Sequence, residues 1–189
     1  MKHAASRALH AYWDRLRNGR AAPERGDLDP RAIRTLLGDV FLLELVKPQH
    51  YLVRLAGTRL CALFCRELKG TRLDALFASE ERPEIDDLLA DTADTVTPVV
   101  AGLQGETAER HALDLELVAL PLRHHGRTQA RLIGALAALD VPYWVGSVPL
   151  ERLRIVSVRR LYPGEANLPE AGDRIRPLGR LRVLPGGRA

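Results

Sequence analysis

The sequence predicts an α+β domain built around one five-stranded antiparallel sheet. Two features of the 189-residue chain support this fold class. Before residue 97, apolar residues recur with a helical period in several stretches, and a pair of strand-like stretches lies among them. From Pro98 onward the period changes to two, which is typical of antiparallel strands with one buried face. The resulting order is helix, helix, two strands, helices, three strands.

Residues 4–18 are predicted to form an amphipathic helix. The apolar residues Ala5, Leu9, Tyr12, Trp13 and Leu16 fall on one stripe, and Gly19 follows as a stop signal. A loop leads from there to Asp29 and Pro30. An aspartate before a proline is a helix start, because the carboxylate caps the first turn and proline suits the first helical position.

The first two strands are predicted at residues 40–46 ("VFLLELV") and 51–57 ("YLVRLAG"), with "KPQH" as the turn. A buried helix is expected over residues 58–66, because this stretch is apolar almost all round. A longer helix is expected over residues 80–96, with Asp86, Asp87, Asp91 and Asp94 mostly on its solvated side.

Three further strands are predicted at residues 99–106, 112–122 and 131–141. The last two are joined by the turn "RHHGRT". Beyond them, "LERLRIVSVRRLY" is suited to a further strand, and "GDRIRPLGRLRVLPGGRA" to an edge strand or an arm.

Composition is that of an ordinary soluble globular protein, with 46% apolar and 28% charged residues. The net charge of +4 permits acidic partners without requiring them. The first residues lack the apolar run of a signal peptide, and no stretch approaches the roughly 20 apolar residues of a membrane span. We therefore expect a cytoplasmic protein. Cys61 and Cys65 are the only cysteines, and we expect two buried thiols in a reducing compartment.

Several stretches together resemble a family of small bacterial single-domain PAS proteins: "YWDRLRNGRAAPERGDLDPRAIRTLLGDVFLLE", "VRLAGTRLCALFCRELKGTRL", "LELVALPL" and "RLIGALAAL". The resemblance covers roughly residues 4–142. It rests on these positions: Tyr12, Trp13, Leu16, Gly19, Arg20, Pro23, Arg25, Asp27, Asp29, Pro30, Ile33, Leu36, Leu37, Val40, Phe41, Leu42, Arg54, Leu55, Ala56, Gly57, Thr58, Phe64, Glu67, Leu68, Gly70, Leu120, Pro121, Leu122, Gly134 and Ala135.

The resemblance implies a PAS-like sheet with helices on one face, and a sensory or signalling role. It divides the chain into an N-terminal helix and loop (1–28), a PAS-like domain (29–145) and an arginine-rich C-terminal extension (146–189). The family offers no catalytic residues to carry over, so we expect no enzyme activity. One departure is Cys65, which stands where similar proteins have glycine in "FGREL", and we expect that spot to be crowded.

Cofactor chemistry known from other PAS domains is not expected here. Flavin-binding light sensors carry their cysteine in an Asn-Cys-Arg-Phe-Leu-Gln stretch, and "LCALFCREL" has neither that asparagine nor that glutamine. Haem-binding PAS domains use a histidine on the helix before the third strand, and residues 80–96 contain none. His50, His111, His124 and His125 lie in or beside predicted turns, so we expect no metal. Asp114 and Glu116, roughly 7 Å apart on one strand face, are interpreted as part of a solvated face.

In the PAS layout, the stretch from Tyr51 to Phe77 places a strand and a helix on two walls of one interior. The residues expected to line it are Phe41, Leu43, Tyr51, Val53, Leu55, Leu60, Leu63, Phe64, Leu115 and Leu117. Two interpretations stay open. The interior is a pocket for a small apolar ligand, or it is a filled core, which the extra volume of Cys65 favours.

Two functions from different classes follow. The first is a non-catalytic sensory module that acts through an unknown protein partner. We expect it to be a homodimer, with the N-terminal helix in or near the interface through Leu9, Tyr12, Trp13 and Leu16. The same stripe could instead cover the outer face of the first strand. The alternative is a nucleic-acid-binding regulator that uses the arginines of the C-terminal extension: Arg154, Arg159, Arg160, Arg174, Arg176, Arg180 and Arg182. An aromatic content of 5% argues against a base-stacking surface.

Overall fold

The computed structural model describes residues 1–46, 50–124, 127–162, 176–178 and 181–183. Its helices are α1 (Ala4–Arg17), α2 (Thr58–Leu63) and α3 (Arg82–Asp94). Short 3-10 turns are η1 (Arg25–Asp27), η2 (Pro30–Ile33), η3 (Leu73–Leu76) and η4 (Ser79–Glu81). The strands are β1 (Val40–Val46), β2 (His50–Ala56), β3 (Val99–Thr107), β4 (Ala112–His124), β5 (Arg127–Ala138), β6 (Leu150–Arg160), β7 (Arg176–Leu178) and β8 (Leu181–Val183).

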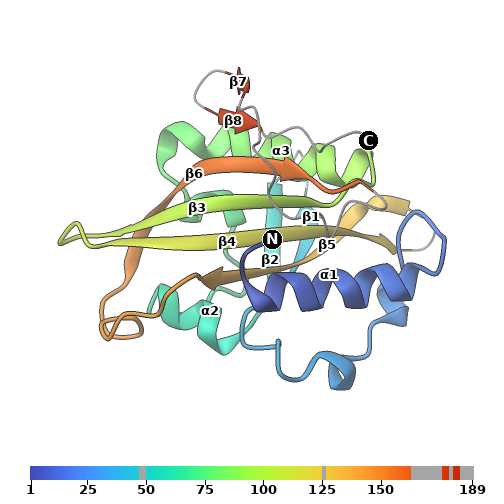
Figure 1. The fold of residues 1–189 in the computed structure, drawn as a ribbon, viewed down its shortest axis with the longest axis horizontal. Helices are drawn as coiled ribbons and strands as arrows, with labels where there is room; N and C mark the ends of the chain where they lie inside the picture. Colours follow the sequence, from blue (N-terminus) through green and yellow to red (C-terminus); the bar gives the residue numbers. More distant parts are fainter. Residues whose placement is uncertain (47–49, 125–126, 163–175, 179–180, 184–189) are drawn as a thin grey trace.

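These strands form one sheet in the order β2-β1-β5-β4-β3-β6-β8-β7 (Figure 1). The first five strands in this order, from β2 to β3, pair antiparallel with their neighbours, which confirms the predicted α+β fold and its central sheet. The one small difference is the number of strands. The stretch "LERLRIVSVRRLY" forms β6, which pairs antiparallel with β3 along its whole length, so the antiparallel part has six strands and not five.

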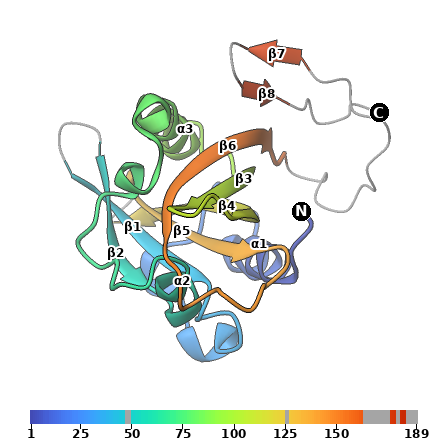
Figure 2. The same cartoon turned by 90° about the vertical axis from the view of Figure 1, so that its left-hand side faces the viewer.

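Helices cover both faces of the sheet (Figure 2). Each face has its own apolar core. On the inner face, α2, η3 and α3 pack over side chains such as Phe41, Val53 and Leu117. On the outer face, α1 packs over β4 and β5, where it buries Val118, Leu120 and similar residues. A sheet that is apolar on both faces needs a layer on each side, and α1 supplies the second layer.

The stripe of α1 is therefore used within the chain. Leu9, Tyr12 and Trp13 are at most 5% exposed, and the partly buried Leu16 packs against the same cluster. Trp13 also donates a hydrogen bond of 2.7 Å from its indole nitrogen to the carbonyl of Pro121 in β4. Of the two predicted roles for the stripe, covering the outer face is the one observed. Leu9, Tyr12 and Trp13 are buried against the sheet, and Leu16 is partly exposed. The homodimer with α1 in or near its interface stays a prediction.

Asp29 caps the 3-10 turn η2 as predicted. Its carboxylate accepts a hydrogen bond of 2.9 Å from the amide of Arg31, and Pro30 occupies the first position of the turn. We expect Asp29→Ala to lower the free energy of unfolding by about 1 kcal/mol. Urea denaturation measures this change, and Asp29→Asn, which keeps a capping oxygen, should cost much less. An unchanged midpoint for Asp29→Ala would show that the cap does not matter.

The helix α2 ends earlier than predicted, at Leu63 instead of residue 66. Phe64 is its C-terminal cap, and Cys65 follows with a φ of 49°, in the left-handed region. Side chains with a Cβ are disfavoured there, and glycine is the usual residue just after a helix end. Cys65 is exposed, so the expectation of a crowded position is wrong. The glycine of similar proteins matches a backbone requirement and not a lack of space.

We expect Cys65→Gly to stabilise the protein by about 0.5–1 kcal/mol, because it relieves the left-handed strain and removes little side-chain packing. The matched control is Arg66→Gly, at an exposed neighbour outside the left-handed region. This control should lower stability, because glycine makes the unfolded chain more flexible. Thermal denaturation of both variants checks the sign. A loss of stability in Cys65→Gly would contradict this account of the helix end.

Candidate functional site

The predicted pocket walls lie where the PAS layout places them, between the sheet and α2. Nine of the ten residues belong to the inner core, and none of the nine is more than 4% exposed: Phe41, Leu43, Tyr51, Val53, Leu60, Leu63, Phe64, Leu115 and Leu117. They come from β1, β2, α2 with its C-terminal cap, and β4. These side chains pack into one continuous apolar cluster with residues from η3 and α3.

Leu55 is the exception, and the prediction that it faces inward is wrong. It is 47% exposed. The cause is a β-bulge in β2: Leu42 pairs with Leu55, but the next residue, Leu43, pairs with Val53, which leaves Arg54 as an extra residue. One extra residue reverses the alternation of a strand, so the side chain after the bulge points to the other face.

The two cysteines are also less buried than expected. Cys61 is half-buried and Cys65 is exposed, and both are free thiols. Burial raises the pKa of the Cys61 thiol, and the nearby carboxylate of Glu67, with Oε1 3.7 Å from the sulfur, adds to this. A raised pKa keeps the thiol protonated and therefore less nucleophilic at neutral pH.

A cleft of about 300 Å³ opens between α2 and the end of β5; we call it the α2–β5 cleft. Its walls are mainly apolar and come from α2, β5 and the loop that follows β5. They comprise Ala62, Leu63, Leu136, Ala137, Ala138, Val141 and Val145, with His3, Asp39 and Arg59 at the polar side. Leu63 and Leu136 also belong to the inner core, so core side chains form part of the cleft wall.

An ion pair stands at the polar side of this cleft. Arg59 donates to both carboxylate oxygens of Asp39, at 2.8 and 2.6 Å, and to the carbonyl of Thr35. Asp39 is 7% exposed, whereas the Arg59 side chain is 58% exposed. The pair therefore fixes a partly solvated guanidinium beside an apolar wall.

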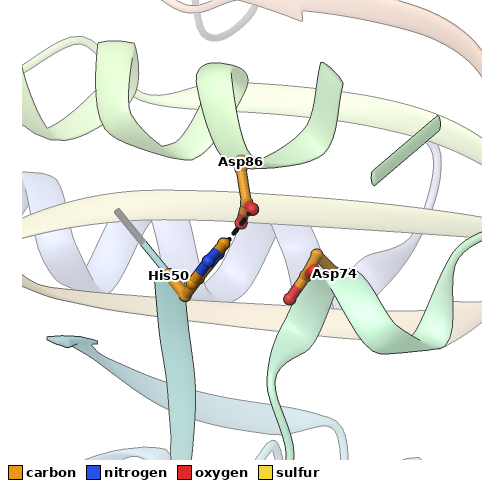
Figure 3. A group of neighbouring side chains, drawn as sticks. All are labelled: His50, Asp74 and Asp86. Atoms are coloured by element: carbon orange, nitrogen blue, oxygen red, sulfur yellow. Dashed lines mark hydrogen bonds and ion pairs between the residues drawn. The ribbon is translucent and has the colours of Figure 1, made fainter. Parts of the chain in front are cut away.

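A second, polar cleft of about 490 Å³ lies where β2, η3 and α3 meet; we call it the His50 cleft (Figure 3). Its position follows from the free edge of β2. The amide of Val53 donates to the carbonyl of Thr71, and the amide of Gly70 donates to the carbonyl of Val53. These bonds hold the segment before η3 against β2, and they bring Asp74 next to His50 at the start of the strand.

Asp86 reaches the same point from α3, with its Oδ2 2.8 Å from His50 Nδ1. Arg72 donates to both oxygens of Asp74, at 2.9 and 2.5 Å. Burial would raise the pKa of Asp74, but its hydrogen bonds from Arg72 hold that pKa below its usual value. Burial raises the pKa of Asp86, and the charge of Asp74 adds to this. Sequence reasoning missed this group, because it placed Asp86 on the solvated side of its helix and His50 in a turn.

The two carboxylates of β4, Asp114 and Glu116, differ in their exposure to solvent. Asp114 is exposed, as expected for a solvated face, but Glu116 is only 4% exposed. The carboxylate of Glu116 accepts hydrogen bonds from the backbone amides of Lys2 and His3, at 2.5 and 2.9 Å. It therefore anchors the segment before α1 on the outer face of the sheet.

The arginines of the C-terminal extension are described only in part. Arg174 and Arg180 lie outside the described residues. Arg154 pairs with Glu80, and Arg160 pairs with Asp91 at 2.5 Å, so these two cations already have acidic partners within the chain.

A family model described as PAS domain matches residues 1–137. A light-oxygen-voltage domain studied with a flavin analogue has 12% sequence identity and a TM-score of 0.47, with 58% of this chain and 83% of that chain covered. A LOV protein of Rhodobacter sphaeroides has 13% sequence identity and a TM-score of 0.45, with 61% of this chain and 71% of that chain covered. A PAS domain of a protein from Colwellia psychrerythraea has 9% sequence identity and a TM-score of 0.43, with 58% of this chain and 97% of that chain covered. No curated protein matches the chain.

Proposed function

We propose that this chain, which belongs to the PAS domain family, senses a small ligand with an apolar body and passes the signal to a protein partner. Family membership supports the sensory role. The same premise favours action by binding and not by catalysis. Within the described residues, no helix has the length and apolar character to cross a membrane. We place the module in the cytoplasm, and we keep the homodimer as a prediction for light scattering to test.

The α2–β5 cleft is the observation that carries the ligand proposal. Its volume of about 300 Å³ is near the lower end of the range for small-molecule sites. A ligand there would contact apolar side chains over most of its surface, and one of them is Leu63, a predicted pocket residue. The guanidinium of Arg59 lies at the polar side. The ligand class that fits is a small, mostly apolar molecule with one hydrogen-bond acceptor or negative group directed at Arg59.

The loop after β5 supplies a route for the signal. Val141 and Val145 line the cleft from this loop, and Tyr143 between them is 96% exposed. A ligand that packs against the two valines would change how the loop is held, and so would change the surface around Tyr143. Exposed aromatic residues are favoured at protein interfaces, so we assign the partner contact to this loop.

A thermal-shift screen of fatty acids, quinones and aromatic acids tests the ligand proposal. We expect a subset of compounds to raise the melting temperature of the wild-type chain, because a ligand that binds only the folded state stabilises it. Leu63→Trp and Ala62→Trp should abolish the rise by filling the cleft. Ala62 is only partly buried, so its variant should fold even if Leu63→Trp does not.

The matched control is Arg66→Trp, which adds the same ring at an exposed position outside the cleft and should keep the shift. The proposal fails if the wild-type chain shows no shift with any compound, or if Ala62→Trp responds as the wild type does.

A further inference from the structure

The hydrogen bonds at His50 Nδ1 in the His50 cleft cannot all be satisfied together. This atom lies 2.8 Å from Asp86 Oδ2, an acceptor, and 2.8 Å from Arg72 Nη2, a donor. If Nδ1 carries a proton, it donates a hydrogen bond to Asp86, but its N–H then opposes the N–H of Arg72. If Nδ1 is unprotonated, it accepts a hydrogen bond from Arg72, but its lone pair then opposes the lone pairs of Asp86. One imidazole nitrogen is thus shared between two groups with opposite needs.

The carboxylate of Asp86 is also incompletely satisfied. The Asp86 side chain is 13% exposed, and its Oδ1 is buried and has no hydrogen-bond partner among the described residues. Arg72 Nη2 is 4.0 Å from Oδ2, which is too far for a hydrogen bond. A buried carboxylate oxygen without a donor is destabilising, and a bound water or cation would satisfy it.

We propose that the His50 cleft is a binding site for a divalent transition-metal ion such as Zn²⁺, with His50, Asp74 and Asp86 as its ligands. One ligand atom from each residue lies within 4.8 Å of the others, so small side-chain rotations bring all three to one ion. The two carboxylates supply the negative charge that a divalent cation requires, and the cleft is open to solvent, which leaves room for water as a further ligand.

In the structure, the guanidinium of Arg72 occupies the position that this ion would take. This guanidinium contacts Asp74 and His50, so it neutralises part of the charge that the metal would neutralise. The Arg72 side chain is 44% exposed and can move outward into the cleft. An ion at Nδ1, in place of the guanidinium, would bind His50 through its lone pair and both aspartates through their oxygens. The conflict at Nδ1 is then removed.

The ligand types indicate which metal suits the site. Imidazole favours Zn²⁺ and the later transition metals, whereas Mg²⁺ and Ca²⁺ prefer oxygen atoms alone. We therefore expect Zn²⁺ to bind the 189-residue chain at one site, and Mg²⁺ to bind far more weakly. This site is separate from the α2–β5 cleft, so its test does not depend on the apolar ligand.

Isothermal titration of the metal-free 189-residue chain with Zn²⁺ at neutral pH tests the proposal. His50→Gln and Asp86→Asn should each weaken Zn²⁺ binding by about tenfold or more, because each removes a ligand. Arg72→Gln should tighten binding by about tenfold, because it removes a competing positive charge. The matched control is His111→Gln, since His111 stacks on Trp144 away from the cleft, and its affinity should equal that of the wild type.

The direction of the Arg72 effect separates a metal site from a purely structural ion-pair network. Arg72→Gln also keeps the test decisive if a ligand variant does not fold. The absence of Zn²⁺ binding in the wild-type chain would overturn the proposal. So would Zn²⁺ binding that His50→Gln and Asp86→Asn leave unchanged, since the ion would then be held elsewhere.

Discussion

Gly134→Ala is expected to lower the free energy of unfolding by about 3 kcal/mol. Gly134 lies in β5, between Phe41 of β1 and Ala119 of β4. A Cβ at this position would lie 2.2 Å from the ring of Phe41 and 2.3 Å from the carbonyl oxygen of Val118. The carbonyl belongs to the backbone of a central strand, and Phe41 is fully buried, so neither can move without disturbing the sheet.

A second sheet glycine provides the control. In β3, a Cβ on Gly102 would meet only the side chain of Ser157, with its hydroxyl oxygen at 2.7 Å. That hydroxyl can rotate away, so Gly102→Ala should change stability by less than about 1 kcal/mol. Urea denaturation of both variants gives the comparison. Equal losses in the two variants would show that the contact with Phe41 and Val118 is not what excludes a side chain from position 134.

We expect the wild-type protein to lose stability at alkaline pH and the Tyr51→Phe variant to lose less. Tyr51 is 1% exposed in the inner core. Burial, with the negative charges of Asp94 and Asp86, raises the pKa of Tyr51 from 10.0 to about 12. The unfolded chain therefore releases this proton at a lower pH than the folded protein does. The contribution to stability is complete below pH 10 and is lost as the pH rises toward 12.

A shift of about two pKa units corresponds to a loss of about 3 kcal/mol across this range. Urea denaturation at several pH values between 9 and 12 measures the slope, which should be shallower in Tyr51→Phe than in the wild type. Tyr143→Phe is the control, because Tyr143 is 96% exposed and should leave the slope unchanged. A wild-type slope that persists in Tyr51→Phe would assign the alkaline transition to other groups.

The central sheet could be predicted from the sequence because each strand carries its own signal. Residues 40–46 are apolar on both faces except at Glu44, and that run forms β1, which lies between β2 and β5. The apolar stripe of α1 likewise indicates a buried helix, although the stripe alone leaves open whether its own sheet or a second copy covers it.

Features that depend on one residue of backbone geometry were missed. The alternation in "YLVRLAG" predicts Leu55 inward, but the bulge at Arg54 reverses it, and an alternating pattern carries no sign of a bulge. At Cys65 the family pattern gave the right signal, a missing glycine. Glycine can indicate either a close approach or a left-handed φ, and only the structure separates the two.

The His50 cleft could not be predicted, because its residues are far apart in the sequence and each is ordinary alone. Asp86 shares a helix with acidic residues on the solvated side, and His50 is the last residue of the predicted turn. They meet because the segment before η3 pairs with the edge of β2, which brings η3 and α3 over the start of that strand. Such a pairing leaves no periodic pattern in the sequence.

Native mass spectrometry of the 189-residue chain with the compound that gives the largest thermal shift is the most direct test of a sensory site in the α2–β5 cleft, because it counts bound molecules. We predict one ligand bound to each wild-type chain, no ligand bound to Ala62→Trp, and one bound to Arg66→Trp. A wild-type chain that carries no ligand, or an Ala62→Trp chain that carries as much as the wild type, would contradict a sensory site in the α2–β5 cleft.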